Sequence, residues 1–223
     1  MQKIVIFTGA GISSESGLGT FRDNGGLWEQ YKIEDVATFE AFKKNPELVL
    51  KFYNKRRKQL LESQPNIAHY SLNKLSEKFE LQIITQNVDD LHERSGSKNV
   101  LHLHGKLKEA RSTIDDTIYQ IKGSKLNLGD LCDKGGQLRP NIVWFGESVP
   151  MMLDAIDITR NADIFIIVGS SLNVYPAASL LNYATNTKRI FYIDPKAELI
   201  KDIKVIKDKA TIAIPKLVNE LLL

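Results

Sequence analysis

The sequence predicts an α/β fold, with a Rossmann-like parallel sheet, helices on both faces, and a small lobe made of two insertions. Short runs rich in β-branched residues alternate with amphipathic stretches along most of the chain. These runs are almost continuously apolar, which is typical of parallel strands that helices cover on both faces. Two stretches break the alternation, and these are the predicted insertions.

Five runs are predicted to form strands of the sheet. They are 3–8 (KIVIFT), 81–86 (LQIITQ), 141–145 (NIVWF), 163–169 (DIFIIVG) and 189–194 (RIFYID). Apolar residues recur at helical spacing in further stretches, which are predicted to be helices. These are 68–79, 176–186 and 214–223.

The two insertions define the predicted domains. Residues 31–65 have a purely helical pattern, in which Pro46 is placed to open a helix. Residues 106–137 are polar and punctuated by glycine. We expect these two stretches to form the small lobe. The larger domain then comprises 1–30, 66–105 and 138–223.

Composition and charge weigh against several classes of protein. The 223 residues are 43% hydrophobic and 26% charged, which is ordinary for a globular protein. A net charge of +3 is too small to indicate nucleic-acid binding. No apolar run approaches the length of a membrane span, and the N-terminus leads directly into the first predicted strand. We therefore expect a cytoplasmic protein without nucleic-acid or membrane partners. We also expect a monomer, although the sequence does not reveal the oligomeric state.

The stretch TGAGISSESGLGTFR (8–22) follows the first predicted strand. Gly9 and Gly11 permit a tight turn and a close approach of the backbone to a pyrophosphate, although such a turn can also be purely structural. A nicotinamide dehydrogenase would have a third glycine at position 14, which is Ser14. It would also have an acidic residue about 20 positions further along, after a second strand. A helical stretch follows instead, so the dehydrogenase interpretation fits poorly.

Motifs in a fixed order resemble those of the sirtuins, which are NAD-dependent protein deacylases. They are GAGISSESGLGTFR (9–22), TQNVDDLHERSG (85–96), LHLHG (101–105), LRPNIVWFGE (138–147) and GSSLNVYPA (169–177). The resemblance covers nearly the whole chain. It implies that the larger domain binds NAD and that the substrates are acylated lysines on proteins.

The resemblance assigns catalysis to His104 and Asn87. It implies that the acyl-lysine carbonyl oxygen displaces nicotinamide from the ribose, and that His104 then acts as a general base on a ribose hydroxyl. The near-neutral pKa of imidazole suits this role. His102, two residues earlier in the same motif, is expected to be structural. A plainer alternative for Asn87 and Asp89 is that they only cap the following helix.

The same motifs imply the contacts with NAD. In the first loop, Ala10, Gly11 and Ser13 are expected to line the phosphates. Phe21 and Arg22 are expected to close over the nicotinamide end, although an isolated arginine is more often solvated. Asp89 is expected to bind the nicotinamide carboxamide, and Asp194 stands where the family often has an asparagine that contacts the adenosine ribose. The full expected set is Gly9, Ala10, Gly11, Ser13, Phe21, Arg22, Gln86, Asn87, Asp89, Gly169, Ser170, Ser171, Asp194 and Ala210.

The acyl group is predicted from KFYNKRRKQ (51–59). Tyr53 and Arg56 lie three residues apart on a predicted helix and therefore share a face. Class III sirtuins carry such a pair, which binds the distal carboxylate of succinyl-, malonyl- or glutaryl-lysine, and Ala37 matches the small residue that leaves room for the longer chain. The alternative is that Arg56 belongs to a solvated basic run. The resemblance therefore implies a desuccinylase or demalonylase with weaker deacetylase activity.

IVWFGE (142–147) resembles the segment that pairs with the substrate peptide as an added strand. Val143 and Phe145 are the candidates for lining the lysine channel. As residues of a core strand they would need no further explanation.

Two departures from the family pattern bear on the small lobe and the first loop. Most sirtuins bind zinc through four cysteines, but this chain has only Cys132, so no zinc is expected. We expect the lobe to be held by apolar packing instead, through Ile114, Ile118, Tyr119, Ile121, Leu126 and Leu128. Gly19 replaces the family's usual proline.

Other functions are left open by the sequence. The same chemistry at the ribose can serve an NAD glycohydrolase or a mono-ADP-ribosyltransferase. A non-catalytic module that binds NAD or ADP-ribose is a further alternative, which the presence of His104 and Asn87 disfavours.

Overall fold

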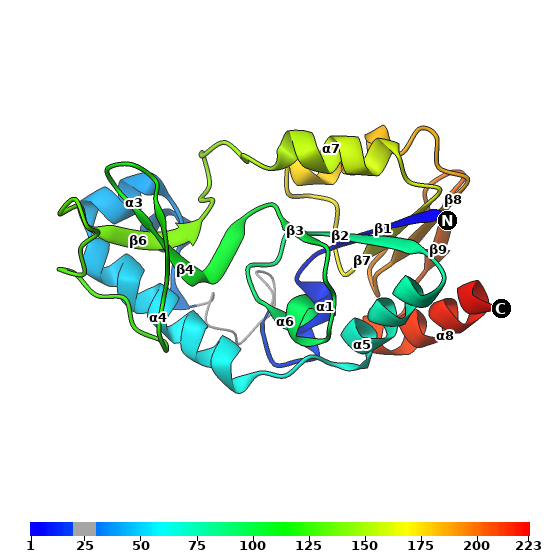
Figure 1. Ribbon diagram of the computed structural model, residues 1–223, viewed down its shortest axis with the longest axis horizontal. Helices are drawn as coiled ribbons and strands as arrows, with labels where there is room; N and C mark the ends of the chain where they lie inside the picture. The colour runs from blue at the N-terminus through cyan, green and yellow to red at the C-terminus, as the bar shows by residue number, and fades with distance from the viewer. Residues whose placement is uncertain (20–29) are drawn as a thin grey trace. The chain divides into compact units, whose positions relative to one another are not determined.

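The computed structural model describes residues 1–19 and 30–223 and has a mixed α/β fold (Figure 1). The chain folds into two compact units. Unit 1 comprises Met1–Ser16, Gln64–Leu103 and Val149–Leu223, and unit 2 comprises Gly17–Ser63 and His104–Ser148. Unit 2 thus takes in residues 104–105 and 138–148, which the sequence pattern places in the larger domain.

Unit 1 contains a six-stranded parallel sheet, which confirms the Rossmann-like fold. Its strands are β1 (Lys3–Thr8), β2 (Glu80–Thr85), β3 (Val100–His102), β7 (Ile164–Val168), β8 (Arg189–Ile193) and β9 (Lys204–Ile206). Their order is β3-β2-β1-β7-β8-β9, so the chain steps outward in one direction from β1 and in the other direction from β7. Such a reversal of strand order is where open α/β sheets bind their ligands.

Helices cover both faces of this sheet (Figure 1). They are α1 (Gly11–Ser14), α5 (Ile67–Lys74), η2 (Leu75–Glu77), α6 (Leu91–Arg94), α7 (Met152–Arg160), η3 (Ala177–Tyr183) and α8 (Ala210–Leu222). Ile4 and Ile6 of β1 pack with residues of α5 and α8. Val5 and Phe7 pack on the opposite face, with residues of α7 and η3. This alternation explains why the strands read as continuous apolar runs.

Unit 2 combines three helices with a three-stranded antiparallel sheet of order β5-β4-β6. The helices are α2 (Ile33–Val36), α3 (Phe39–Lys44) and α4 (Pro46–Glu62), and the strands are β4 (Gly105–Ser112), β5 (Ile118–Gln120) and β6 (Leu138–Ile142). As predicted, α4 begins at Pro46. The side chain of Asn45 caps it by accepting a hydrogen bond from the Leu48 amide at 3.1 Å.

The prediction that 141–145 is a strand of the parallel sheet is wrong. The strand in this region is β6 (Leu138–Ile142), which pairs antiparallel with β4 in unit 2. An apolar run indicates a strand but does not reveal its partner, and β4 itself carries too many charged residues to be recognised as a strand.

The apolar packing expected for residues 106–137 is also largely wrong. Leu126 is buried, but Ile114 is 58% exposed and Leu128 is 52% exposed. Polar contacts from α4 hold this region instead. The fully buried Arg57 donates from Nε to the Leu107 carbonyl at 2.7 Å and from Nη1 to the Ser124 carbonyl at 2.9 Å. Asn54 exchanges hydrogen bonds with the backbone of Leu126.

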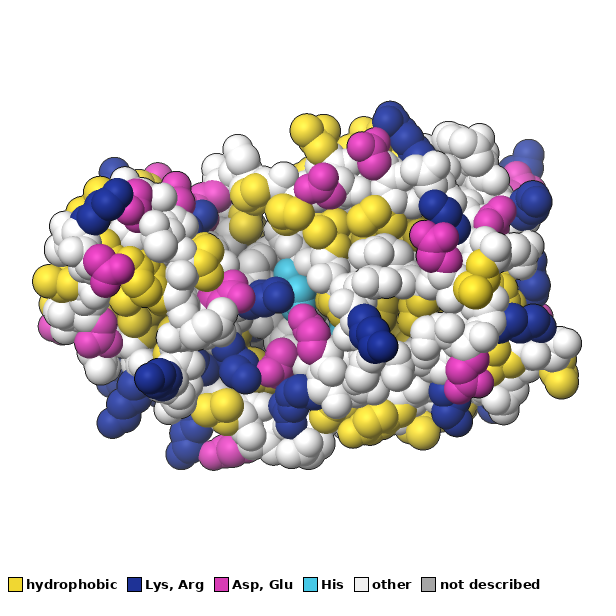
Figure 2. Space-filling model, viewed as in Figure 1, with side chains coloured by type: hydrophobic (Ala, Val, Ile, Leu, Met, Phe, Trp, Pro, Cys, Tyr) yellow, Lys and Arg dark blue, Asp and Glu magenta, His cyan; other side chains and the backbone are white. Residues whose placement is uncertain are grey.

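The surface carries charges of both signs, interspersed over the face shown in Figure 2. This distribution accords with the small net charge. Among the described helices, none has the length and apolar character that crossing a bilayer would require.

Candidate functional site

In unit 1 the loops after β1 and β7 meet through glycine backbone. The Gly9 amide donates to the Val168 carbonyl at 3.0 Å, and the Gly11 amide donates to the Gly169 carbonyl at 2.8 Å. A Cβ on Gly9 would lie 2.7 Å from the Gly169 oxygen, and a Cβ on Gly11 would lie 2.6 Å from the Gly169 Cα. Gly169 has a φ of +61° and its own Cβ would meet the Ile12 amide nitrogen. No side chain fits at any of these positions.

Asn87 joins this crossing to the end of β2. Its side-chain Nδ2 donates to Ser13 Oγ at 3.1 Å, and its backbone amide donates to Thr85 Oγ1 at 3.0 Å. Within the described residues, Asn87 Oδ1 has no hydrogen-bond partner. Asn87 is only 7% exposed, so its carbonyl oxygen is a partly desolvated acceptor. The cap role that the sequence allowed for Asn87 is not the contact observed.

Asp89 does serve the following helix. Its Oδ1 accepts from the amide of Leu91, the first residue of α6, at 3.1 Å. Burial raises the pKa of this carboxyl, and hydrogen bonds from the Leu91 amide and the Ser13 hydroxyl oppose that rise. Both interpretations weighed in the sequence therefore stay compatible for Asp89, because a carboxylate has a second oxygen.

A buried polar network lies behind these residues, and sequence reasoning missed it. Thr8 Oγ1 donates to Thr85 Oγ1 at 2.8 Å, and His92 Nε2 lies 3.0 Å from Thr8 Oγ1. The rings of His92 and His69 meet edge to face, with centroids 5.0 Å apart. Burial lowers the pKa of His69 to about 4 and that of His92 well below its usual value, so both rings are neutral at neutral pH.

Asn66 ties this network to the first loop. Its Nδ2 donates to the Ile12 carbonyl at 2.8 Å and to Ser16 Oγ at 2.9 Å, and its backbone amide donates to His69 Nδ1 at 3.3 Å. The only sequence signal was the Asn-x-x-His spacing before a helix, which resembles a capping box.

His102 and His104 have different surroundings. His102 is buried, with Nδ1 3.0 Å from the Asn87 carbonyl and Nε2 2.8 Å from Glu93 Oε1. Its expected structural role accords with these contacts. His104 is half-buried and begins the second segment of unit 2, and its carbonyl accepts from the Val143 amide at 3.0 Å.

The remaining expected NAD contacts of unit 1 follow β1, β2, β7 and β8 or begin α8. Ser170 Oγ donates to Gln86 Oε1 at 3.1 Å, while the Tyr192 hydroxyl donates to the Ser170 carbonyl at 3.0 Å. Asp194 Oδ1 accepts from the Lys196 amide at 2.8 Å. Ala10 is half-buried, Ser171 is exposed, and Ala210 is the buried first residue of α8. Phe21 and Arg22 lie outside the described residues.

In unit 2 the residues expected to bind the acyl group lie together. Tyr53 and Arg56 are neighbours on α4, with the guanidinium carbon 5.8 Å from the centre of the phenol ring. Burial raises the pKa of Tyr53, and the nearby Arg56 opposes the rise. The carbonyl of the buried Ala37 accepts from the Phe145 amide at 3.0 Å. Phe145 is 47% exposed and Val143 is half-buried, so neither is a plain core residue.

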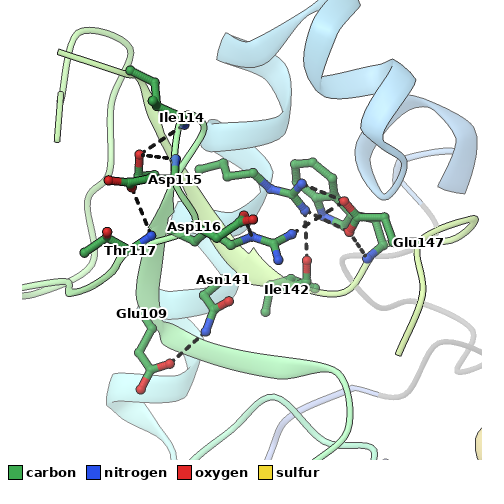
Figure 3. Close-up of polar contacts among 12 residues, drawn as sticks. Glu109, Ile114, Asp115, Asp116, Thr117, Asn141, Ile142 and Glu147 are labelled. Atoms are coloured by element: carbon green, nitrogen blue, oxygen red, sulfur yellow. Dashed lines mark hydrogen bonds and ion pairs between the residues drawn. The ribbon is translucent and has the colours of Figure 1, made fainter. Parts of the chain in front are cut away.

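An ion pair supports the segment after β6 (Figure 3). Arg139 Nη1 and Nη2 bind the two carboxylate oxygens of Glu147 at 2.6 and 2.9 Å, and Nη2 also donates to the Ile142 carbonyl at 3.0 Å. Glu147 Oε2 accepts from the Trp144 amide at 2.8 Å. Burial acts to raise the pKa of Glu147, but hydrogen bonds from Arg139 and Trp144 outweigh it and the pKa is lowered. The carboxylate is therefore ionised and fully engaged.

Cys132 is held by hydrogen bonds. Its Sγ accepts from Ser112 Oγ and from the Gly136 amide, both at 3.2 Å. Nearby, Lys134 forms an ion pair with Asp115 at 2.9 Å. In the part of the chain that the structure describes, no group of three or more His, Cys, Asp or Glu residues is arranged to hold a metal ion.

Known proteins resemble this chain in both sequence and fold. Residues 9–176 match the model of the Sir2 family. An NAD-dependent protein deacylase of Helicobacter pylori (strain J99) is 49% identical over 225 residues, covering all of this chain and 96% of that protein. One of Bacteroides thetaiotaomicron is 50% identical over 202 residues, covering 88% of this chain and 86% of that protein.

Solved structures of Sir2 homologues have a similar fold. A Sir2 homolog in complex with NAD superposes with a TM-score of 0.90 at 40% identity, covering 99% of this chain and 89% of that one. A Sir2 homologue in complex with ADP-ribose superposes with a TM-score of 0.91 at 39% identity, with 99% and 92% coverage.

Proposed function

This chain belongs to the Sir2 family and is an NAD-dependent protein deacylase, and from that premise we propose that it removes succinyl and malonyl groups from lysine in preference to acetyl. The observation that carries the proposal is the pairing of Tyr53 with Arg56 on one face of α4. A phenol hydroxyl and a guanidinium can both donate, and a carboxylate is the acceptor that suits both. An acetyl group offers them no charged acceptor.

The residues of unit 1 fit NAD. The loops that cross at Gly9, Gly11 and Gly169 leave backbone where side chains would otherwise stand, as close approach to a pyrophosphate requires. Buried Asn87 and Asp89 lie at the end of β2 and offer carbonyl and carboxyl groups to hydroxyl and amide donors. When bound, NAD would supply both the ribose that accepts the acyl group and the nicotinamide that leaves.

We assign the general-base role to His104, which would take a proton from a ribose hydroxyl onto its imidazole. Imidazole suits that step because its ordinary pKa lies close to neutrality. Asn87 orients the ribose: its Nδ2 is committed to Ser13 Oγ, so Oδ1 is the atom left to accept from a hydroxyl. Val143 and Phe145 would line the path of the lysine side chain.

We also propose that this protein binds no structural zinc and works as a cytoplasmic monomer. Support for the first point is that Ser112 and Gly136 satisfy the thiol of Cys132 and that Lys134 pairs with Asp115. Metal analysis of the purified protein tests it, because a structural site would retain about one equivalent of zinc.

The acyl preference is tested with peptides of one sequence that carry succinyl-, malonyl- or acetyl-lysine. Deacylation is followed by mass spectrometry with and without NAD. We expect kcat/KM for the succinyl peptide to exceed that for the acetyl peptide by about tenfold or more, because a charge-assisted hydrogen bond contributes about 1.5–3 kcal/mol. Nicotinamide release that does not depend on the acyl peptide would indicate an NAD glycohydrolase instead.

Two variants of α4 test whether Arg56 binds the substrate carboxylate or only contributes to the positive charge of the helix. Arg56→Met removes the proposed partner of the carboxylate, whereas Lys58→Met removes a cation from the exposed part of the same helix. Succinyl turnover should fall about tenfold or more in the first variant and stay near that of the wild type in the second. If both variants turn over succinyl peptide like the wild type, the proposed acyl preference has lost its basis.

A further inference from the structure

Trp144 is bonded to the hydroxyl of Tyr53. Indole Nε1 lies 2.9 Å from the phenol oxygen, and both side chains are buried, Tyr53 to 1% and Trp144 to 2% exposure. An indole N–H can only donate, so the phenol oxygen is the acceptor in this bond. The proton of the Tyr53 hydroxyl is therefore not used by Trp144. Within the described residues, that hydroxyl has no other hydrogen-bond partner.

A buried donor without an acceptor is rare in folded proteins and points to a partner that arrives later. Here the acceptor is expected to carry negative charge, because the guanidinium of Arg56 lies 5.8 Å from the Tyr53 ring. The phenol keeps its proton at neutral pH, since burial raises its pKa. Both observations match a carboxylate at the end of an acyl chain.

Trp144 is itself fixed from three sides. Its backbone amide donates to Glu147 Oε2 at 2.8 Å. The guanidinium carbon of Arg139 lies 3.5 Å from the centre of a Trp144 ring, and Arg139 is locked by its paired hydrogen bonds to Glu147. The ring of Phe42 packs against the indole, with centroids 5.4 Å apart. These contacts hold the indole in the orientation in which its N–H points toward Tyr53.

We propose that Trp144 is a positioning residue for acyl selection: it occupies the acceptor side of the Tyr53 hydroxyl and so directs that hydroxyl's proton to the distal carboxylate of the substrate. A hydroxyl proton rotates freely unless its surroundings choose a direction. Donation from the indole also polarises the phenol O–H and makes it a stronger donor. This inference rests on the proposed preference for carboxylated acyl groups.

The test compares the wild type with Trp144→Phe, which keeps an aromatic ring between Arg139 and Phe42 but has no N–H. The quantity measured is the ratio of kcat/KM for succinyl peptide to that for acetyl peptide. We expect the ratio to fall about fivefold, because about that much binding is lost with one hydrogen bond. The change should appear in KM for the succinyl peptide. Phe42→Leu is the matched control, because it loosens the packing on the indole and leaves the N–H in place.

A double-mutant cycle with Tyr53→Phe separates positioning from general damage. If Trp144 acts through the Tyr53 hydroxyl, Trp144→Phe should leave the ratio unchanged once Tyr53→Phe is present. An equal fall in both backgrounds, or no fall in the wild-type background, would overturn the inference. If Trp144→Phe does not fold, benzothienylalanine at position 144 keeps the shape of the indole and removes only the N–H, and the same outcomes apply.

The wild-type measurement distinguishes this inference from the function on which it rests. A wild-type ratio near one would mean that the proposed acyl preference fails, before any variant is made. A high wild-type ratio that Tyr53→Phe lowers and Trp144→Phe does not would leave the acyl preference standing and reject the role of Trp144.

Discussion

In unit 1 the loops after β1 and β7 contact each other through glycine backbone. In unit 2, by contrast, side chains position the Tyr53 hydroxyl: Trp144 donates to it, Arg139 packs on Trp144, and Glu147 binds Arg139. The first arrangement requires positions without a Cβ atom, and the second requires particular polar side-chain atoms. A site of the first kind should tolerate no enlargement. A site of the second kind should lose selectivity by steps when single bonds are removed.

The largest effect is expected at the glycine crossing. Gly169→Ala places a Cβ against the backbone of Ile12 at a φ of +61°, so both the contact and the conformation are unfavourable. We expect deacylation to fall by about two orders of magnitude or more, and the free energy of unfolding to fall by about 3 kcal/mol. Activity assays and urea unfolding measure the two effects.

Gly19→Ala is the control for this substitution. Gly19 belongs to the stretch 8–22, which supplies Gly9 and Gly11 to the crossing, but a Cβ on Gly19 would meet none of the described residues within 4 Å. This variant should fold with unchanged or slightly raised stability, because alanine restricts the unfolded chain more than glycine does. Equal damage at Gly19 and Gly169 would mean that close backbone approach is not what the crossing requires.

A smaller effect is expected from Arg57, the neighbour of Arg56 on α4. Arg57→Met leaves the carbonyls of Leu107 and Ser124 without their charged donor, which should lower the free energy of unfolding by roughly 2–4 kcal/mol. Arg56→Met, by contrast, should change acyl preference more than stability. Urea unfolding of the two variants beside the wild type makes this comparison. If the two arginines exchange these effects, the assignment of α4's faces is wrong.

Sequence reasoning succeeded where the signal was local. The apolar runs predicted four strands of the parallel sheet, and the glycines after β1 and β7 were recognised because their spacing is itself the feature that close approach requires. It failed where two distant segments had to be matched. The run at 141–145 was assigned to the parallel sheet, but the strand here is β6, whose partner β4 is not apolar.

The side-chain contacts of unit 2 also join distant segments, and for that reason the sequence could not predict them. The bond from Trp144 to Tyr53 joins residues 91 positions apart, and nothing in either local pattern marks the other. Arg57 carried no local sign that distinguished it from the exposed basic residues beside it. The expectation of apolar packing in the small lobe followed from the missing zinc cysteines, and it missed the buried guanidinium of Arg57.

The smallest effect concerns the buried histidines of unit 1 and appears only with pH. The pKa of His69 is about 4 in the folded protein because burial disfavours the charged ring, and about 6.5 is usual for an unfolded chain. Well above pH 6.5 the ring is neutral in both states, so its contribution to stability is complete there. Below pH 6.5 the unfolded chain binds the proton and the folded protein does not, so stability falls until the pH reaches the folded pKa.

Between pH 6.5 and pH 5, His69 alone should therefore lower the free energy of unfolding by about 1.5 kcal/mol, measured by urea unfolding at the two pH values. His69→Gln is the informative variant. Glutamine has no titration in this range and can still accept the hydrogen bond from the Asn66 amide, as a capping box allows. The variant should be less sensitive to acid than the wild type while it retains deacylation at neutral pH. An unchanged pH dependence would assign the acid sensitivity to His92 or to carboxylates instead, because His92 is buried against the same ring and burial lowers its pKa as well.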